Sequence, residues 1–290
     1  MRIVPVTDAD IDEYRTLPVD LDYEDYVIAS FADLVAAAGF YKAVDDNGVM
    51  LAVARNYPVV GGYAYLGSAR TGVPYRGRGI ATAMARFLID DLRRRGFTWV
   101  GLSTDDTNVP VHRSMEKVGL RRLGEKAFVV VKAGGLAQFL RANGIDVPTA
   151  TSGREVTERA EKIDLMRSML ASARNREHGP EQLAVLSCGP FVILPPHADL
   201  VELTADWYRL RVAGGQPYLL RSGTTEGWDW TEASFYGGDL LRHPAVLADL
   251  CAVAPADREL WLLTTPAGLA SIDRDSADWS GVLRLYGAEL

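Results

Sequence analysis

The stretch Val73-Pro74-Tyr75-Arg76-Gly77-Arg78-Gly79-Ile80-Ala81-Thr82 decides the fold of the first half of this 290-residue chain. It joins an apolar, tyrosine-containing run at 62–73 to the clearest helical pattern in the sequence. In that pattern one apolar stripe recurs with helical spacing, formed by Ile80, Met84, Phe87, Leu88 and Leu92. Gly96 supplies a stop signal. The sequence therefore predicts a strand that passes through a glycine-rich turn directly into a helix.

The glycines and arginines of this turn predict an anion site. Glycines allow a tight curve in which several N–H groups point into one concavity, and the helix N-terminus adds positive potential. Arg76 and Arg78 add full charges, and Thr82 adds a hydroxyl. A pyrophosphate fits such a cradle, although an ordinary turn with solvated arginines is the competing interpretation. The turn matches neither the P-loop nor the Gly-x-Gly-x-x-Gly dinucleotide fingerprint.

The flanking segments predict an α+β domain. Asn47-Gly48 between two apolar runs is a strong hairpin signal, and Asn108 before Val109-Pro110 is a good helix start. The expected strands are 2–6, 40–44, 49–56, 62–73 and 97–102, and the expected helices are 8–16, 20–38, 80–95 and 108–119. A closing hairpin is expected at 120–132, with its turn near Gly124-Glu125.

Two linked motifs resemble the GCN5-related N-acetyltransferases (GNAT). Arg76-x-x-Gly79-x-Ala81 is similar to the acyl-CoA pyrophosphate loop of that family, and 97–104 to its next strand. Met115-Glu116-Lys117-Val118-Gly119-Leu120 resembles the end of its following helix, usually Tyr-Glu-Lys-Leu-Gly-Phe. The resemblance covers the chain up to about residue 132. It implies a GNAT-type mixed central sheet flanked by helices, and acyltransferase activity.

The resemblance also implies a site for acetyl-CoA as co-substrate. The strand end Thr71-Gly72-Val73 would pair with the pantetheine, and a backbone N–H near Val73 would polarise the thioester carbonyl. A gap beside Ser103-Thr104 would admit the cofactor arm, and Asn108 would bind it or cap the helix. The remaining cofactor-binding positions are Arg76, Gly77, Arg78, Gly79, Ile80, Ala81, Thr82 and Met115.

One departure leaves the proton chemistry open. Met115 stands where the family has its general acid, a tyrosine, and methionine cannot protonate a thiolate. Candidate replacements are a water, Tyr63 or Tyr65; Ser114 is adjacent but points about a quarter-turn away. The candidate bases are Glu24, Asp22 and Asp25, for which a solvated acidic face is the competing interpretation. Loop, capping or packing roles are favoured for Asp105, Asp106 and His112.

The second half of the sequence differs from the first. Residues 1–132 carry 17 basic and 17 acidic residues, so the net charge of −7 belongs to 133–290. Five of the six tryptophans lie there too, and Trp228-Asp229-Trp230 could grip a cation, although core or interface packing is favoured. The predicted organisation is a GNAT domain at 1–133, a linker at 134–152 and a second α+β domain at 153–290. That domain lacks an Arg-x-x-Gly-x-Gly/Ala match, so we expect a degenerate GNAT copy, an acceptor-site domain or a dimerisation domain.

The expected activity is acetyl transfer from acetyl-CoA to a primary amine of a small molecule, an amino acid or an aminated natural product. The alternatives are a non-catalytic acyl-CoA-binding regulatory module and a protein N-terminal or lysine acetyltransferase. The acidic balance argues against a nucleic-acid partner, no apolar run is long enough to span a membrane, and a homodimer is possible. With only Cys188 and Cys251 and no visible signal peptide, we expect a cytoplasmic protein. No metal ligand set stands out among His178, His197 and His243.

Overall fold

The computed structural model describes residues 1–21, 24–146, 153–174, 186–187, 192–195, 197–225, 228–235, 240–264 and 266–290. Several residues singled out in the sequence lie outside this part of the chain, namely Asp22, His178 and Cys188. Parts of the predicted linker at 134–152 do so as well, and so do parts of 184–194, which the sequence predicts to be a strand because of its apolar character. Within the described residues, no helix has the length and apolar character needed to cross a membrane.

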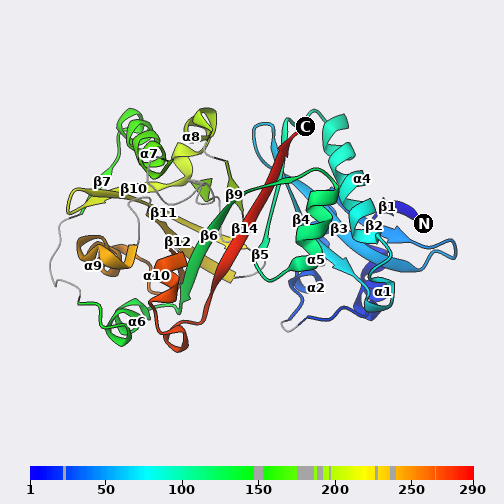
Figure 1. The fold of residues 1–290 in the computed structure, drawn as a ribbon, viewed down its shortest axis with the longest axis horizontal. Coiled ribbons are helices and arrows are strands. Elements are labelled where there is room, and N and C mark those ends of the chain that lie inside the picture. The colour runs from blue at the N-terminus through cyan, green and yellow to red at the C-terminus, as the bar shows by residue number, and fades with distance from the viewer. Residues whose placement is uncertain are drawn as a thin grey trace. The chain divides into compact units, whose positions relative to one another are not determined.

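The chain folds into two compact units that exchange short segments (Figure 1). Unit 1 contains Met1–Leu102, Asn108–Arg122 and Tyr286–Leu290. Unit 2 contains Ser103–Thr107 and Leu123–Leu285. The last five residues of the chain therefore belong to the first unit, which no local sequence signal indicates. The domain bounds at 133 and 153 stay a prediction.

Unit 1 is built on a mixed sheet. Strands β1 (Arg2–Pro5), β2 (Phe40–Val44), β3 (Met50–Val60) and β4 (Tyr63–Thr71) pair antiparallel in chain order, and β5 (Trp99–Asp105) then pairs parallel to β4. The predicted hairpin at Asn47-Gly48 is confirmed, with Gly48 at φ +87° between β2 and β3.

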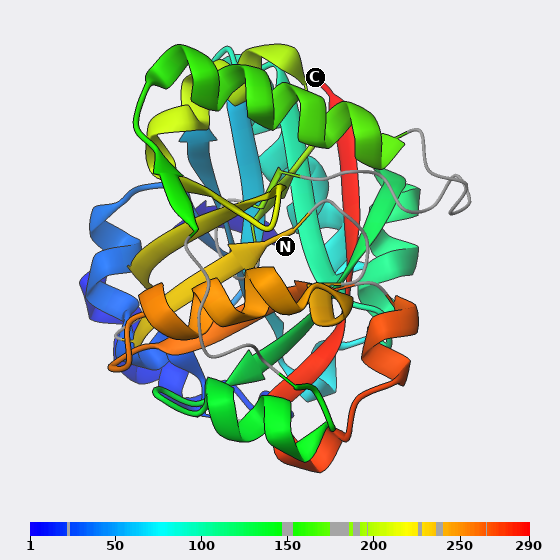
Figure 2. The same cartoon turned by 90° about the vertical axis from the view of Figure 1, so that its left-hand side faces the viewer.

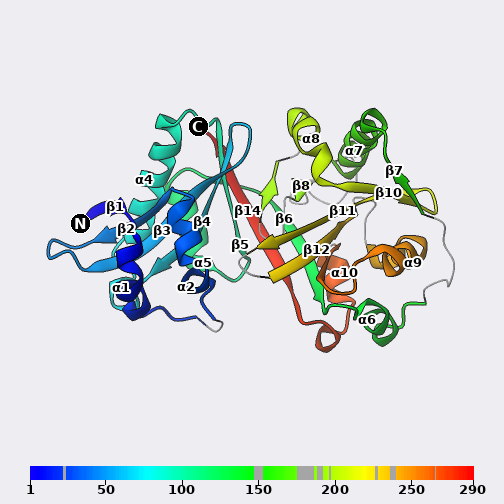
Figure 3. The same ribbon diagram turned by 180° about the vertical axis from the view of Figure 1, so that it is seen from behind.

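Helices cover both faces of this sheet (Figure 3). On one face, α4 (Ile80–Arg94) and α5 (Val109–Lys117) pack through the predicted stripe, with Met84, Leu88 and Leu92 at most 1% exposed. On the other face lie α1 (Ile11–Thr16), α2 (Tyr26–Ala29) and α3 (Phe31–Ala36) over a separate apolar cluster. The single helix expected at 20–38 is wrong, because Asp25 caps a helix that begins at Tyr26 and the helical backbone breaks at Ser30.

The closing hairpin expected at 120–132 is also wrong. Residues Arg121–Val131 form one continuous strand, β6, with Gly124 and Glu125 inside it. Its partner in unit 2 is β13 (Glu259–Thr264), where Val131 pairs with Leu260. The partner strand lies more than a hundred residues away along the chain, so local turn signals could not show the pairing.

Unit 2 repeats the chain order of unit 1. Strand β7 (Arg154–Val156) is followed by α7 (Arg159–Arg174) and α8 (Ala198–Thr204), as β1 is followed by α1–α3. Then come three antiparallel strands, a helix and a parallel strand: β10 (Arg209–Ala213), β11 (Gln216–Thr225), β12 (Trp228–Ser234), α9 (Pro244–Val253) and β13. Short β8 (Leu186–Ser187) and β9 (Ile193–Leu194) pair separately, and α10 (Pro266–Ala270) and β14 (Trp279–Glu289) complete the chain.

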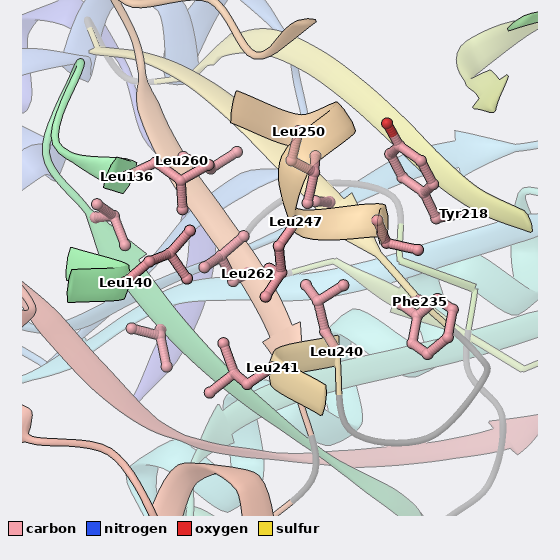
Figure 4. Packing of buried hydrophobic residues seen from close by; sticks show 14 of the residues in the cluster. Leu136, Leu140, Tyr218, Phe235, Leu240, Leu241, Leu247, Leu250, Leu260 and Leu262 are labelled. Carbon is pink, nitrogen blue, oxygen red and sulfur yellow. The ribbon is translucent and has the colours of Figure 1, made fainter. Parts of the chain in front are cut away.

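The core of unit 2 lies between its sheet and two helices. Figure 2 shows α9 and α6 (Leu136–Ala142) on one side of β10–β12, with α7 on the other. The α9 side holds a large apolar cluster that includes Leu247, Leu250 and Leu262 (Figure 4). The segment Trp228-Asp229-Trp230 begins β12, and Trp230 is 3% exposed, which agrees with its interpretation as core.

Candidate active site

The predicted pyrophosphate loop is an exposed turn between β4 and α4. Gly77 and Gly79 have φ values of +75° and +78°, where any other residue would be strained. A Cβ added at either glycine would meet nothing within 4 Å, so the space above the loop is open. Arg76 and Arg78 are both exposed. The loop therefore presents a curved, uncovered backbone flanked by two positive charges.

Backbone N–H groups line this curve. The first helical N–H of α4 to find a carbonyl is that of Ala83, which donates to Gly79 O at 3.0 Å. Across the described residues, the N–H groups from Gly77 to Thr82 donate to no backbone oxygen. The last four of these, from Gly79 to Thr82, are the donors that an α-helix leaves without an intrahelical partner at its N-terminus. Their convergence with the helix dipole fits a pyrophosphate.

The arginines of the loop are only weakly engaged by the protein. The guanidinium of Arg76 lies 3.6 Å from the Asp20 carboxylate, with the side chains 46% and 80% exposed. Arg78 lies over the Tyr75 ring, 5.7 Å from its centroid. Exposed ion pairs contribute about 0–1 kcal/mol, so both arginines can turn to a phosphate at little cost.

Strand β4 parts from its parallel neighbour before it reaches the loop. Only three pairs join β4 to β5, from Tyr63↔Trp99 to Tyr65↔Gly101. β4 continues for six more residues, Leu66–Thr71, without pairing to β5. At about 3.3 Å per residue this leaves roughly 20 Å of strand edge between the last pair and the loop. An extended ligand arm can pair along such an edge.

A β-bulge lies in the middle of that open segment. Val53 pairs with Arg70 and Arg55 with Gly67, so Ala54 of β3 faces two residues of β4, Ser68 and Ala69. Ser68 has φ +50°, an uncommon value for a residue with a side chain. A bulge bends its strand and increases the local twist, so it favours the parting of β4 from β5. The bulge was not predicted from the sequence, although Gly67, a glycine inside the strand, is a signal for one.

Comparison with known proteins identifies this architecture. Residues 6–120 match the family model of the acetyltransferase (GNAT) family. Residues 6–120 form a GNAT acetyltransferase domain. The chain therefore contains an acyltransferase, and the resemblance seen in the sequence is confirmed. No curated protein matches the sequence.

Solved structures extend the likeness of fold to the full chain. A GCN5-related N-acetyltransferase from Sphaerobacter thermophilus superposes with a TM-score of 0.57 at 15% identity, covering 99% of this chain and 95% of that one. A protein from Thermoplasma acidophilum, provisionally named an acetyltransferase, gives a TM-score of 0.57 at 12% identity and covers all of both chains. At these identities the likeness concerns the fold, which is the mixed sheet with flanking helices that the sequence predicted.

In the GNAT domain, the backbone N–H of Val73 already has a hydrogen-bond partner. It donates to Pro18 O at 2.8 Å, and the N–H of Gly72 donates to Leu51 O at 3.0 Å. The expectation that a backbone N–H near Val73 polarises a thioester stays a prediction, and the amides of Val73 and Gly72 themselves already have carbonyl partners. Thr71 pairs with Ala52 of β3, and its carbonyl accepts a bond from Arg76 Nε at 3.4 Å.

Helix α5 holds Asn108, Ser114 and Met115. The Asn108 side chain accepts a bond from Val111 N–H at 3.4 Å, so it caps the helix. Met115 is 6% exposed and packs in the apolar cluster beneath α4. Ser114 lies beside the loop helix, with its Oγ 3.5 Å from that of Thr82. His112 is buried and stacks on Tyr286, as its packing interpretation expected.

The candidate acids Tyr63 and Tyr65 lie on β4, and the candidate cofactor residue Thr104 lies on β5 beside Asp105. Tyr63 begins β4 and packs on Trp99 with 5.7 Å between ring centroids. It lies five positions, about 17 Å of strand, before Ser68 at the bulge. Tyr65 is 2% exposed on the same strand. Thr104 lies in the part of β5 that belongs to unit 2, where the Asp105 carboxylate accepts two bonds from Thr107.

The acidic loop before α2 divides into exposed and buried parts. Glu24 is exposed, as its surface interpretation expected. Asp25 is buried, where its carboxylate caps α2 through Val27 N–H and accepts bonds from Arg70 Nη2 at 3.0 Å and from the Tyr14 hydroxyl. Burial, and then the hydrogen bond to Asp25, raise the pKa of Tyr14 above its ordinary value. Asp25 therefore holds α2 against β4, a structural role.

The described residues of unit 2 differ from unit 1 at the place that corresponds to the open edge of β4 and the start of α4. In unit 1 the hairpin closes at the pair Val60↔Tyr63, and the pairing of β4 to β5 ends at the third residue of β4, Tyr65. In unit 2 the hairpin closes at the pair Thr225↔Trp228, and the pairing of β12 to β13 continues to the sixth residue of β12, Ala233. Before α9, Leu240 and Leu241 are at most 8% exposed and fill the core (Figure 4). Pro244 at the start of α9 has no N–H to offer.

Proposed function

We propose that the GNAT domain transfers an acetyl group from acetyl-CoA to the primary amine of a small molecule, an amino acid or an aminated natural product. The observation that carries the proposal is the open edge of β4. Six residues without a partner on β5 lead from the last strand pair to a loop of exposed N–H groups. The pyrophosphate would bind the loop from Arg76 to Thr82, and the pantetheine would pair along β4.

The acetyl group would then lie at the bulge. The arm enters from the loop end of β4 and cannot pass Tyr65, where β4 and β5 are joined. The middle of the permitted segment is Ser68-Ala69. The extra residue of a bulge is left out of the ladder, so its N–H can polarise a thioester carbonyl. Direct attack by a neutral amine in a ternary complex completes the transfer.

The acceptor would approach over the α1–α2 side of the sheet. Aromatic rings of Tyr57, Tyr65 and Trp99 follow one another there, with centroid separations of 6.1 and 6.5 Å. Arg55 lies over Tyr57, 4.5 Å from its centroid. Tyr65 and Trp99 are 2% exposed, so the half-buried Tyr57 is the ring of the three that an acceptor can reach. A ring beside a guanidinium suits an amine that also carries an apolar or carboxylate group. Such a chemistry favours amino acids and their derivatives among the proposed acceptors.

Thiol release tests the proposal. Purified full-length protein is incubated with acetyl-CoA and single amines from a panel of amino acids, aminosugars and polyamines, and free CoA is measured with a thiol reagent. We expect amine-dependent release, with the acetylated amine detected by mass spectrometry. Binding of acetyl-CoA without release for any amine would instead support the non-catalytic module. Release only with peptides that offer a free N-terminus or lysine would move the substrate class to proteins.

A further inference from the structure

In the proposed transfer a proton must reach the departing sulfur. Helix α5 does not provide the tyrosine that the family uses to supply it. Met115 has no exchangeable proton and is 6% exposed in the core beneath α4. The Ser114 hydroxyl faces Thr82 on α4 rather than β4. A thiolate leaves tolerably without full protonation, because its pKa is near 8.5, but the amine must still lose a proton for the amide to form.

A pair of hydroxyls meets at the bulge. The Tyr26 hydroxyl on α2 donates to Ser68 Oγ on β4 across 3.3 Å. Ser68 is 5% exposed, whereas Tyr26 is partly exposed. Within the described part of the chain the Ser68 hydroxyl donates to no protein acceptor, so its own proton is available. In this hydrogen bond the partly exposed Tyr26 hydroxyl is the donor and the buried Ser68 hydroxyl is the acceptor.

Neighbouring groups hold this pair in place. Arg70 lies over the Tyr26 ring, 5.0 Å from its centroid, and its Nη2 bonds Asp25 at 3.0 Å. Asp25 caps the helix on which Tyr26 is the first residue. Strained backbone at Ser68 is typical of residues that a fold keeps for a specific position. Ser68 and Tyr26 are therefore fixed on both sides of their shared hydrogen bond.

From this geometry we infer that Tyr26 and Ser68 form the proton relay of the acetyl transfer, a role that rests on the proposed function. The amine nitrogen bonds to the carbonyl carbon, and the C–S bond breaks with its electron pair on sulfur. Ser68 gives its hydroxyl proton to sulfur and takes that of Tyr26, which in turn takes a proton from nitrogen. The products are an amide and a free thiol, and both hydroxyls return to their starting state.

The matched test uses Tyr26→Phe and Ser68→Ala in the full chain. Phenylalanine keeps the ring beneath Arg70 and removes only the hydroxyl. We expect Tyr26→Phe to lower kcat about 100-fold while KM for acetyl-CoA stays within about threefold, because general acid–base groups contribute about 10²–10⁴ in rate. The double variant should lose no more than the worse single variant, since the two hydroxyls act as one unit.

Controls separate this inference from the proposed function. Tyr41→Phe removes a hydroxyl from the opposite face of the sheet, where Tyr41 packs on Phe87, and should leave kcat unchanged. If Ser68→Ala does not fold, Ser68→Gly tolerates the positive φ and removes the same hydroxyl. Wild-type kcat in Tyr26→Phe, or a loss that lies entirely in acetyl-CoA affinity, overturns the relay and leaves the acetyltransferase standing. Absence of thiol release by the wild-type protein overturns both.

Discussion

The guanidinium of Arg70 and the carboxylate of Asp25 form an ion pair at 3.0 Å, with side chains only 10% and 6% exposed. The pair joins the loop before α2 to β4, next to the bulge. Asp25 was a candidate base in the sequence, yet both of its oxygens serve protein partners.

Asp25→Asn should therefore destabilise unit 1. Removing one charge of a buried pair leaves the other uncompensated and typically costs about 3–5 kcal/mol. Urea denaturation should show a loss of about 3 kcal/mol in the free energy of unfolding. Asp20→Asn is the matched control, because that carboxylate is 80% exposed beside Arg76 and should contribute less than about 1 kcal/mol. Equal losses in the two variants would contradict a structural role for Asp25.

Restoring the tyrosine of the family at position 115 should not restore a general acid. Met115 is 6% exposed within the apolar cluster beneath α4. A larger, polar side chain there overpacks the core at a cost of about 1–3 kcal/mol. Met115→Tyr should lower the melting temperature without raising kcat, whereas Met115→Leu should change both little. A rise in kcat would show that position 115 reaches the reacting atoms.

Leu240 in unit 2 should contribute to stability but not to cofactor binding. Its side chain is 0% exposed at the place that corresponds to the loop of unit 1. Leu240→Ala should lower the free energy of unfolding by about 2–5 kcal/mol. Calorimetry on the folded variant should give an unchanged affinity for acetyl-CoA and one site per chain. Two acetyl-CoA sites per chain in the wild-type protein would contradict this prediction, which rests on the pairing of β12 to β13 as far as Ala233.

Acid should weaken unit 2 through Asp249. Burial alone would raise the pKa of this carboxyl, but hydrogen bonds from Arg211 at 2.7 and 2.8 Å and from Tyr218 at 2.5 Å lower it below its ordinary value. The unfolded chain then takes up its proton first, near pH 4, so this contribution is full above about pH 4 and is lost as pH falls through the native pKa. Unfolding midpoints of Asp249→Asn should fall less steeply than those of the wild type between about pH 5 and pH 3. Parallel slopes in the two proteins would exclude Asp249 as their source.

Local sequence patterns were sufficient for most of unit 1. The stripe from Ile80 to Leu92 and the turn at Asn47-Gly48 specify their structures within a few residues, because helical periodicity and left-handed turns are local properties. The loop is equally local, since its geometry depends on Gly77 and Gly79. The resemblance to the family rests on this same segment.

Contacts between distant parts of the chain could not be predicted from the sequence. The partner of β6 is β13, and the segment Tyr286–Leu290 returns to unit 1. Both depend on contacts between residues that are far apart along the chain. The relay pair is of the same kind, because Tyr26 and Ser68 are 42 residues apart and meet only when α2 packs beside the bulge. Local patterns indicate only the acidic neighbours of Tyr26, because its partner Ser68 is not near it along the chain.

Calorimetric titration of acetyl-CoA into the wild type, Gly79→Asp and Gly48→Asp tests the central claim most directly. Both glycines have positive φ, +78° and +87°, and open space around the missing Cβ, so the two variants carry the same backbone strain. Only Gly79 lies among the N–H groups of the loop. The account predicts that Gly79→Asp lowers the affinity about 100-fold, which is about 2.7 kcal/mol, while Gly48→Asp stays within about threefold of the wild type. Equal affinities in all three proteins, or no binding by the wild type, would contradict it.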